Sequence, residues 1–399
     1  MENIYLKRDI EKAFKQIITE FPAVTVTGPR QAGKTTLIKH ILGKDYDYVT
    51  LDDFSARRLA QTDPGMFLDT FFKGKLIIDE AQYAPDLFPQ IKMKIDENPR
   101  EKGRFIITGS QKFLLAEKFT ETLAGRVGIL SMETLSLSEI SAFTGIKNGQ
   151  ELFENACLRG TYPQVYAENI SSLQRWYDTY IQTYLERDVK TLYNVGDITA
   201  FSAFYKILSY RCGQILNLSA IAADIGAAVS TIKKWVSILE AGGLIYLLYP
   251  YHANTRTRLT KSPKVYFMDN GMVCRLNNIT DKKTLNTSPL LGYLFENYCI
   301  SEAVKKVRNT GARETFFFYR TAKGAEVDLV IEKEGKFTLC EFKSGMRFEP
   351  GMLDGIKDAR AKIGAFSGAQ AYVVNSSEDN NNINPATGII GIRKFLEMR

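Results

Sequence analysis

The stretch Val24–Thr36, VTVTGPRQAGKTT, decides the fold of this chain. Its first four residues are all Val or Thr, a composition that suits a buried parallel strand. A complete G-x-x-x-x-G-K-[ST] pattern follows at Gly28–Thr35, and Thr36–Leu42 has the apolar spacing of a helix. Strand, glycine loop and helix in this order form a phosphate-binding loop. The alternative is a glycine turn before an ordinary helix, but every fixed position of the pattern and both flanks agree with the loop.

This loop has the chemistry that a nucleoside triphosphate requires. Gly28 and Gly33 allow the backbone to curl so that consecutive N–H groups face the phosphates. The start of the following helix adds partial positive charge. We expect Lys34 to reach the β- and γ-phosphates and the Thr35 hydroxyl to bind Mg²⁺, so the expected cofactors are ATP and Mg²⁺. The predicted nucleotide-binding residues are Gly28, Pro29, Arg30, Gln31, Ala32, Gly33, Lys34, Thr35 and Thr36.

A second apolar strand, Lys75–Gln82, ends in two carboxylates. Side chains at the end of such a strand can reach the metal and the attacking water. We expect Asp79 to hold Mg²⁺, and Glu80 to orient and deprotonate the water. By itself, an apolar run followed by Asp-Glu commonly does no more than cap a helix. Downstream of an intact phosphate-binding loop, the catalytic interpretation is favoured.

Two later stretches add candidate catalytic residues. Arg104–Gln111 is a further predicted buried strand, expected between the two strands that carry the nucleotide site. Thr108 and Ser110 at its end are candidate sensors of the γ-phosphate, unless they form only a turn and a helix N-cap. Arg126 follows Gly125 and has two open interpretations. It stabilises transition-state charge in its own chain or in a neighbouring subunit, or it forms a surface salt bridge.

These stretches together resemble a known family. Gly28–Thr35, Leu76–Gln82, Ile107–Gln111 and Ala124–Arg126 are similar to a prokaryotic group of AAA-superfamily ATPases that carry a C-terminal domain of unknown function. Two later motifs resemble the same group. The group's Gly-Gly-Phe/Tyr-Pro stands here with Thr161 in place of the second glycine, and its Leu-Glu-Arg-Asp stands at 185–188. The resemblance covers essentially the whole chain and implies ATP binding and hydrolysis.

Composition limits the remaining possibilities. At 399 residues the chain is long enough for two or three domains, and 45% hydrophobic with 24% charged residues is typical of a soluble globular protein. No stretch approaches the ~18 apolar residues of a membrane span, and the N-terminus has no signal-peptide core. Five scattered cysteines and two histidines argue against a disulfide framework or a zinc site. We therefore expect a cytoplasmic protein without membrane contact.

The middle of the chain, residues 150–262, has helical spacing and then a winged-helix pattern. Trp176, Tyr180 and Tyr184 follow one helical face and are interpreted as a core stripe. In 217–250, two short helices meet at a glycine turn, and an apolar strand follows, as in a helix-turn-helix with a wing. The net charge of +7 permits a nucleic-acid partner without requiring one.

DNA contact through this region is one of two open interpretations. Basic and hydroxyl side chains at the second helix and after the wing have the right chemistry for phosphate contacts. Equally, the winged helix could serve only to pack domains together. The candidate contact residues are Ser230, Thr231, Lys233, Lys234, Arg256, Arg258, Lys261 and Lys264.

The last third, residues 263–399, contains a predicted hairpin of Glu326–Glu332 and Lys336–Lys343. It places Asp328 beside Glu341, with Lys343 on the same face as Glu341. This arrangement resembles the PD-(D/E)xK nuclease fold, in which a helical acid, here Glu296, completes the site. The resemblance implies Mg²⁺ held by Asp328, Glu341 and Glu296, and water activated by Lys343. The alternative is ordinary salt bridging in an exposed hairpin.

The sequence therefore predicts an α/β protein in three parts. They are a P-loop NTPase parallel sheet at 1–149, a helical and winged-helix region at 150–262, and an α/β restriction-endonuclease-like domain at 263–399. The expected function is a Mg²⁺-dependent ATPase acting with nucleic acid, DNA rather than RNA, with a metal-dependent nuclease activity left open. The alternative is an ATP-switched regulatory or scaffold protein with a non-cleaving nuclease-like domain. A homo-oligomer is compatible with either function.

Overall fold

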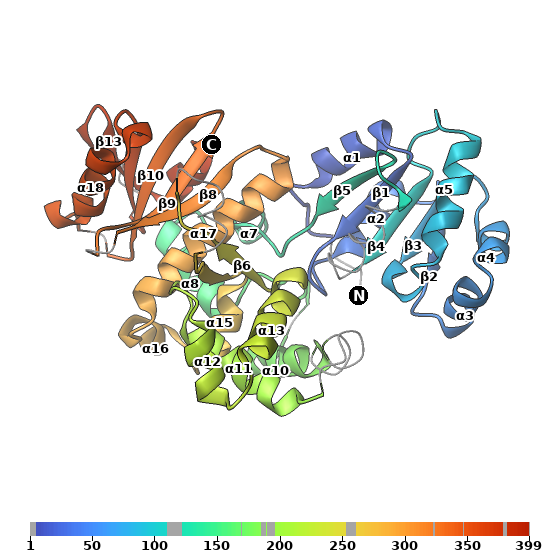
Figure 1. Ribbon diagram of the computed structural model, residues 1–399, viewed down its shortest axis with the longest axis horizontal. Helices are drawn as coiled ribbons and strands as arrows, with labels where there is room; N and C mark the ends of the chain where they lie inside the picture. The colour runs from blue at the N-terminus through green and yellow to red at the C-terminus, as the bar shows by residue number, and fades with distance from the viewer. Residues whose placement is uncertain are drawn as a thin grey trace.

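The structure is a computed structural model, and it describes residues 5–109, 122–168, 170–184, 189, 196–252, 261–321, 324–345, 347–377 and 381–398. Ser110, Arg256 and Arg258 lie outside the described residues, so their predicted roles stay predictions. Figure 1 shows an N-terminal lobe built on one sheet, a C-terminal sheet on the opposite side, and a helical region between and below them.

The N-terminal lobe is a parallel five-stranded sheet with the order β2-β3-β4-β1-β5. The strand β4 lies between β1 and β3, as predicted for the strand that carries Thr108. The strands are β1 Ala23–Thr27, β2 Asp47–Thr50, β3 Leu76–Asp79, β4 Phe105–Gly109 and β5 Val127–Ser131. The helices are α1 Glu11–Glu20, α2 Lys34–Leu42, α3 Phe54–Thr62, α4 Pro64–Phe71, the short 3₁₀ turn η1 Ala81–Tyr83 and α5 Leu87–Glu97.

Helices cover both faces of this sheet because alternate strand side chains point to opposite sides. Val24 and Val26 of β1 pack with apolar residues of α1 and α2 on one face. Ile78 of β3 and Ile107 of β4 pack with α4 and α5 on the other face. All five residues of β1 are buried, as the run of β-branched residues predicts for a central strand.

The middle region is helical and ends in a two-stranded antiparallel sheet of β6 and β7. Trp235 of α13 packs against Phe201 and Phe204 of α11, with ring centroids 5.3 and 5.5 Å apart. The predicted boundary between the middle and the last part, at residue 262, lies between β6 and β7. Because these two strands pair, residues on both sides of the predicted boundary belong to one sheet. The elements are α7 Leu137–Thr144, α8 Gly149–Leu158, α9 Gln164–Ala167, α10 Leu173–Tyr184, α11 Ile198–Tyr210, α12 Leu218–Ile225, α13 Val229–Ala241, β6 Ile245–Leu248, β7 Lys264–Phe267, α15 Asn270–Leu276 and α16 Lys282–Thr287.

The C-terminal part is a mixed six-stranded sheet with the order β12-β13-β11-β10-β9-β8. The predicted hairpin is present as β9 and β10, with Glu334 and Gly335 at positive φ in its turn. The strands are β8 Thr315–Arg320, β9 Glu326–Lys333, β10 Lys336–Lys343, β11 Gln370–Asn375, β12 Asn381–Asn384 and β13 Thr387–Gly391. The helices are α17 Leu291–Thr310, η3 Pro350–Leu353, α18 Asp354–Lys362, η4 Gly364–Phe366 and α19 Ile392–Glu397.

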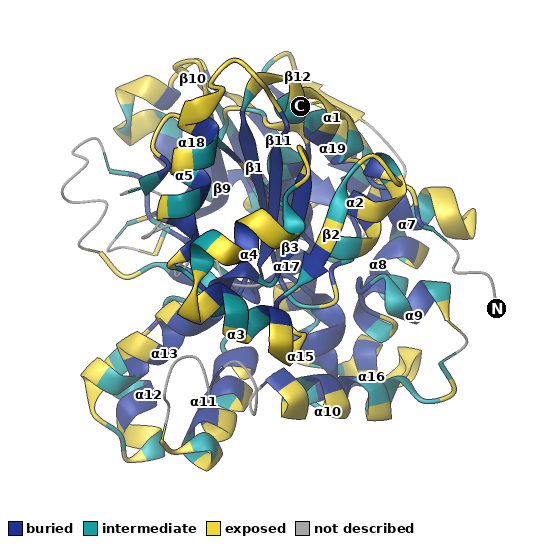
Figure 2. Cartoon of the chain, turned by 90° about the vertical axis from the view of Figure 1, so that its right-hand side faces the viewer, coloured by how far each residue is buried: buried dark blue, intermediate teal, exposed yellow. Residues whose placement is uncertain are grey.

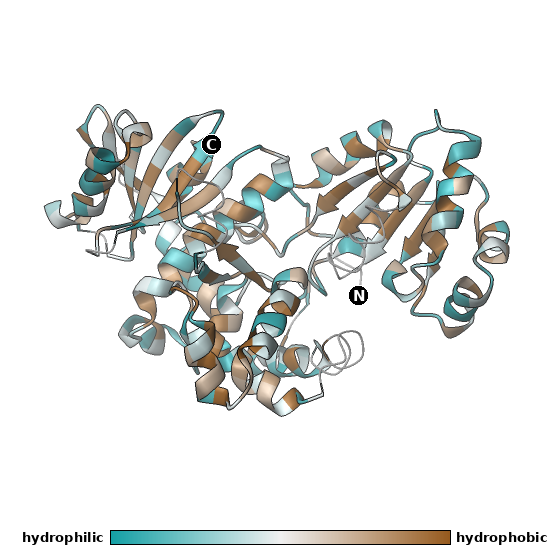
Figure 3. Cartoon of the chain, viewed as in Figure 1, coloured by the Kyte–Doolittle hydropathy of each residue, from teal (hydrophilic) through white to brown (hydrophobic). Residues whose placement is uncertain are grey.

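One apolar cluster joins the middle region to the C-terminal sheet. It runs from Leu6 through the helical region and α17 to Phe395 of α19. In Figure 2 the dark blue of α17 marks it as an interior helix, and Figure 3 shows apolar residues concentrated on the strands of both large sheets. All five cysteines are buried and none is in a disulfide. Among the helices that the structure describes, none combines the length and the apolar character needed to cross a membrane.

Candidate functional site

The loop between β1 and α2 has the backbone shape of a phosphate cradle. Gly28, Gln31 and Gly33 have φ values of +146°, +58° and +93°. At Gly28 a Cβ atom would lie 1.9 Å from the carbonyl oxygen of Met132, so no side chain fits there. The glycine requirement inferred from the pattern therefore has a physical cause in this loop.

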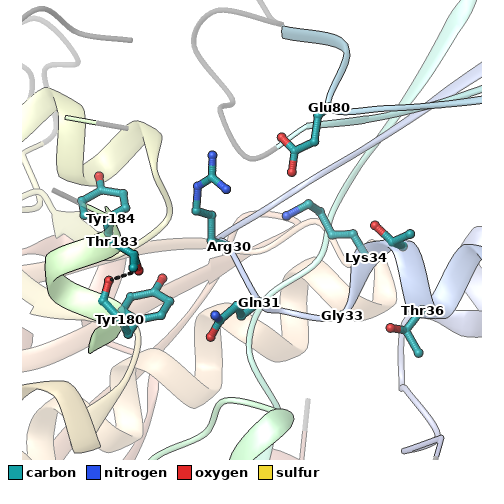
Figure 4. A pocket seen from close by; sticks show the side chains of 10 residues that line it. Arg30, Gln31, Gly33, Lys34, Thr36, Glu80, Tyr180, Thr183 and Tyr184 are labelled. Atoms are coloured by element: carbon teal, nitrogen blue, oxygen red, sulfur yellow. Dashed lines mark hydrogen bonds between the residues drawn. The ribbon is translucent and has the colours of Figure 1, made fainter. Parts of the chain in front are cut away.

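Lys34 begins α2 and its side chain folds back over the loop. The Nζ atom donates to the carbonyl oxygens of Gly28 at 3.0 Å and Pro29 at 2.8 Å. The residue is 7% exposed, and its ammonium group faces the cavity above the loop (Figure 4). In this position the ammonium group can exchange its two carbonyl partners for the phosphate oxygens of a bound nucleotide.

Asp79, at the end of β3, receives hydrogen bonds from three hydroxyl groups. Thr35 Oγ1 lies 3.0 Å from its Oδ2, Tyr48 OH lies 2.8 Å from the same oxygen, and Thr108 Oγ1 donates to Oδ1. Burial, together with the hydrogen bond to Asp79, raises the pKa of Tyr48 above its ordinary value. Carboxylate and hydroxyl oxygens beside a phosphate cradle form a ligand set suited to hydrated Mg²⁺. Thr108 therefore lies where the sequence predicted it, whereas Tyr48 had no sequence signal.

Glu80 follows Asp79 with a left-handed backbone, φ +58°. Only four non-glycine residues of the described chain have positive φ, and two of them, Gln31 and Glu80, line this cavity. Such strained conformations concentrate at functional sites. The Glu80 carboxylate accepts a hydrogen bond from Gln82 and points into the cavity near Lys34 (Figure 4). This is a suitable position for a base that acts on a water molecule beside the γ-phosphate.

The cavity above the loop has a volume of about 460 Å³. From the N-terminal lobe it is lined by Arg30, Gln31, Gly33, Lys34, Thr35, Thr36 and Glu80. Its opposite wall comes from α10 of the middle region, through Tyr180, Thr183 and Tyr184 (Figure 4). Two members of the predicted core stripe are buried, Tyr180 at 4% and Tyr184 at 5% exposed, whereas Trp176 is half-buried. Helical spacing predicted that the tyrosine rings are buried, but it could not indicate that they also face a nucleotide cavity.

The turn after α13 also contacts the loop. A Cβ atom on Gly243, which has φ +71°, would lie 3.1 Å from Pro29 Cδ. A Cβ atom on Gly242 would lie 2.9 Å from the hydroxyl oxygen of Tyr184. The turn that follows α13, the second helix of the predicted helix-turn-helix, therefore lies directly against the phosphate-binding loop.

Arg8 is a buried partner of the loop that sequence analysis missed. Its guanidinium group donates to the carbonyl oxygens of Ala32 and Glu133, both at 2.7 Å. It also forms an ion pair with Glu139 at 3.0 Å, in which the two side chains are 3% and 1% exposed. The signal could not be found in the sequence because the partners are up to 131 positions away, on a different element.

Arg126 does not reach the loop of its own chain. It forms a bidentate ion pair with Asp96, at 2.7 and 3.2 Å. It immediately precedes β5, whose first residue pairs with the first residue of β1, so it lies at the edge of the sheet opposite Gly28. This geometry agrees with the salt-bridge interpretation and does not place Arg126 beside the phosphate-binding loop of its own chain. A role towards a neighbouring subunit stays a prediction.

The acids of the predicted nuclease-like site do lie together. Glu341 forms an ion pair with Lys343 at 2.7 Å, and Asp328 Oδ2 accepts from the backbone N–H of Phe342 at 2.8 Å. Burial, together with the charges of Glu296 and Glu341, raises the pKa of Asp328 well above its usual range. Burial also raises the pKa of Glu341, although the neighbouring Lys343 opposes this.

Lys264 lies among these acids. This position corrects two expectations: that Lys264 contacts DNA, and that the acids hold Mg²⁺. Lys264 is 3% exposed, and its Nζ lies 2.8 Å from Glu296, 2.5 Å from Glu326 and 3.9 Å from Asp328. Lys264 is therefore not available to a DNA phosphate. Burial opposes its charge, but Glu296, Asp328 and Glu326 raise the pKa of the ammonium group. Within the part of the chain that the structure describes, no three acidic, His or Cys side chains are arranged to hold a metal ion.

The other candidate DNA contacts within the described chain remain accessible. Ser230, Lys233 and Lys234 near the start of α13 are exposed, as is Lys261 before β7, and Thr231 is half-buried. Phosphate contact by these side chains stays a prediction.

Three protein-family models match consecutive parts of the chain. An AAA domain matches residues 20–141, a Domain of unknown function (DUF8612) matches 150–283, and a Domain of unknown function (DUF4143) matches 291–395. The first agrees with the five-stranded sheet and its loop.

Among solved structures, the chain is similar to the Walker-type ATPase PABY2304 of Pyrococcus abyssi. The identity is 13% and the TM-score 0.45, over 69% of this chain and 97% of that one. It is also similar to the ORC2 protein of Aeropyrum pernix in its ADP form, at 12% identity and a TM-score of 0.33, over 71% and 96% of the two chains. Both likenesses are too distant to carry an argument about function.

Two mycobacterial proteins are much more similar in sequence. They are the uncharacterized proteins Rv2008c of Mycobacterium tuberculosis and Mb2031c of Mycobacterium bovis, each 31% identical over 334 residues. The matched region covers 83% of this chain and 72% of each relative. The chain therefore belongs to the family of these mycobacterial proteins, and it carries an AAA-type ATPase domain at its N-terminal end and DUF4143 at its C-terminal end.

Proposed function

We propose that this protein is a Mg²⁺-dependent ATPase whose nucleotide state controls its binding to nucleic acid, DNA rather than RNA. The observation that carries the proposal is the composition of the nucleotide cavity. One wall is the phosphate-binding loop with Lys34 and Glu80, and the other is α10 of the middle region. A ligand in this cavity touches both parts, so its presence or absence alters how they pack.

The residues of the loop divide the work of ATP hydrolysis. Magnesium-bound ATP brings the phosphoryl group that is transferred to water. Lys34 would bind its phosphate oxygens, and Thr35 and Asp79 would hold the hydrated metal ion. Glu80 orients the water and accepts its proton. The Thr108 hydroxyl donates to the Asp79 carboxylate and accepts from the backbone N–H of Glu80 at 3.3 Å, so it holds the Asp79 side chain and the Glu80 backbone in place.

The helix α13 supplies the connection to nucleic acid. Lys233 and Lys234 are exposed near its first turns, where a recognition helix meets DNA. Its other end leads into Gly242, which lies against Tyr184, and Gly243, which contacts Pro29 of the phosphate-binding loop. One rigid helix of 13 residues thus spans from the basic surface to the nucleotide site. A change in the loop is transmitted along this helix.

Measuring affinity for a DNA duplex in three nucleotide states tests the proposal. The full chain is titrated with labelled DNA at low salt, without nucleotide, with MgADP and with a non-hydrolysable MgATP analogue. We expect the affinity to depend on the nucleotide, and Lys233→Glu with Lys234→Glu to weaken it by about tenfold or more, since two phosphate contacts become repulsive. Lys12→Glu with Lys15→Glu on the N-terminal lobe is the control of equal charge change. Equal loss in the two double variants would contradict a specific role of α13.

The second candidate is an ATP-switched regulatory or scaffold protein with a non-cleaving C-terminal domain. The position of Lys264 among the acids favours a C-terminal domain that does not cleave, since the ammonium lies where the nuclease resemblance implied Mg²⁺. Nucleotide binding without DNA affinity in any nucleotide state would support this candidate. Sedimentation of the full chain with and without MgATP would show whether the nucleotide drives self-association.

A further inference from the structure

We propose that Lys264 is the resident cation of the C-terminal acidic centre, and that its ammonium group permanently takes the place of a divalent metal ion. The acidic centre is the group of carboxylates Glu296, Glu326, Asp328 and Glu341. It then acts as an internal ionic joint that fastens the β6–β7 hairpin of the middle region to the C-terminal sheet. This inference does not depend on the proposed ATPase or nucleic-acid function.

Two carboxylates lie within hydrogen-bond distance of the lysine ammonium group, and a third lies farther away as an ion-pair partner. An ammonium group has three N–H donors and no acceptor. Around Lys264 Nζ, carboxylate oxygens lie at 2.8 Å on Glu296, 2.5 Å on Glu326 and 3.9 Å on Asp328. These acids come from α17 and β9, whereas the lysine comes from β7. The contacts therefore join three elements that are separate in the sequence.

Other donors complete the arrangement. The Tyr266 hydroxyl, also on β7, donates to Glu296 at 2.5 Å, and the backbone N–H of Phe342 donates to Asp328 at 2.8 Å. The Oε1 atom of Glu341 forms an ion pair with Lys343, whereas its Oε2 atom is buried without a hydrogen-bond partner. The oxygens that a metal would need are thus largely engaged with donors from the chain itself.

Lys264 is anchored on both sides of its backbone, and its side chain is almost fully enclosed. Its backbone pairs with Leu248 of β6 on one side and with Ile215 on the other, and the side chain is 4% exposed. A Mg²⁺ ion requires oxygens at about 2.0–2.1 Å in octahedral geometry, and it would meet the ammonium at the same oxygens. Removing the ammonium alone would leave buried carboxylates without a counter-ion, which is strongly unfavourable. The site implied by the nuclease resemblance therefore does not fit the residues present.

The proposal predicts that removing the lysine creates a metal site. In Lys264→Met, the carboxylates of Glu296 and Asp328 and the buried oxygen of Glu341 become available to a divalent cation. The probe is Mn²⁺, added to the full chain without nucleotide and followed by electron paramagnetic resonance and by the thermal unfolding midpoint. We expect one saturable Mn²⁺ site in the variant, at least about tenfold tighter than any binding to the same residues in the wild type. We also expect a lowered unfolding midpoint that Mn²⁺ raises again.

The control is Lys333→Met on the same sheet, which removes an exposed lysine paired with Glu314 at 3.2 Å and should leave Mn²⁺ binding unchanged. If Lys264→Met does not fold, the double variant with Glu326→Gln removes one uncompensated charge while leaving the three remaining carboxylates in place.

The wild type decides the question even without these variants. If the wild type binds Mn²⁺ saturably and this binding disappears in Asp328→Asn, the proposal is overturned. If the wild type shows no such Asp328-dependent binding at millimolar Mn²⁺, the proposal is supported. A folded Lys264→Met or double variant that gains no Mn²⁺ site would also overturn it. None of these readouts requires ATP or DNA, so the outcome is independent of the proposed function.

Discussion

At the scale of single residues, the carboxylate of Asp79 organises the nucleotide site. Hydroxyl groups from three different elements, Thr35, Tyr48 and Thr108, donate to it. Hydrogen bonds to a charged acceptor are stronger than neutral ones. They hold the carboxylate where a metal ion beside the phosphates would need it, without any rearrangement of β3. Glu80, next to it, is tied to this network only through its backbone N–H, which donates to Thr108, and its side chain lines the cavity.

This division of roles predicts the effect of Glu80→Gln. The amide keeps the size and the hydrogen-bonding reach of the side chain but cannot accept a proton at neutral pH. We expect MgATP to bind about as tightly as in the wild type, and turnover to fall by about 10²–10⁴-fold, the usual contribution of a general base. Single-turnover hydrolysis and equilibrium titration of the same preparation measure the two quantities. Equal turnover in variant and wild type would reject the assignment of Glu80 as the base.

The sequence allowed the loop residues to be predicted because each has a local cause. Gly28 is required by one close contact with Met132, and Lys34 and Thr35 follow it at fixed spacing. The position of Thr108 was predictable because neighbouring parallel strands end at one edge of a sheet. Lys264 was assigned to the surface because its charge suggested solvent, whereas its partners lie 32 or more positions away. Long-range pairs of this kind leave no periodic signal in one sequence.

At the scale of elements, the segment before α1 is attached to the phosphate-binding loop. Arg8 bridges the loop carbonyl of Ala32, the backbone of Glu133 and the carboxylate of Glu139. The planar guanidinium group has five N–H donors in a fixed fork and reaches acceptors that lie in different directions, whereas the ammonium of a lysine is a compact point charge. Since the contacts are buried, they are shielded from water and salt. The N-terminal segment therefore helps to fix the shape of the cradle.

Replacing Arg8 by Ala should affect both stability and nucleotide affinity. It leaves the Glu139 carboxylate buried without its cation, which costs about 3–5 kcal/mol in the free energy of unfolding. Arg8→Lys should restore part of the stability but not the full affinity for MgATP. Urea unfolding and nucleotide titration distinguish these effects. The control is Lys357→Ala, which removes an exposed pair with Asp354 at 3.1 Å and should change stability by less than about 1 kcal/mol. An Arg8→Ala protein as stable as this control would contradict the role of Arg8.

The sequence allowed the order of the elements in the middle region to be predicted. It did not show which other parts of the chain these elements contact. Glycine at the turn after α12, with φ +74° at Gly226, and the apolar spacing of α13 are local signals. The contact of Gly243 with Pro29 and the position of Tyr184 over the cavity depend on how two parts of the chain pack. That packing buries side chains from both parts, and a single sequence does not show which faces meet.

At the scale of the whole molecule, α17 connects the two lobes. Near its C-terminal end, Arg308 forms an ion pair with Glu133 at 2.5 Å. One turn earlier, Lys305 donates to the carbonyl oxygen of Leu135 at 2.9 Å. Near its N-terminal end, Glu296 belongs to the acidic centre with Lys264. The helix thus contacts the connection that follows β5 at one end and the hairpin of the middle region at the other. The three parts are joined by buried polar contacts rather than by loose linkers.

Binding of MgATP to the purified full chain, measured by isothermal titration calorimetry, tests the central claim most directly. The account predicts one saturable site per chain, and loss of that site in Lys34→Ala, because Lys34 supplies the cation for the phosphates in the cavity between the loop and α10. Lys44→Ala, which changes an exposed lysine just after the same helix, is the control and should bind as the wild type does. No saturable heat at millimolar MgATP in the wild type, or equal binding by Lys34→Ala, would contradict the account.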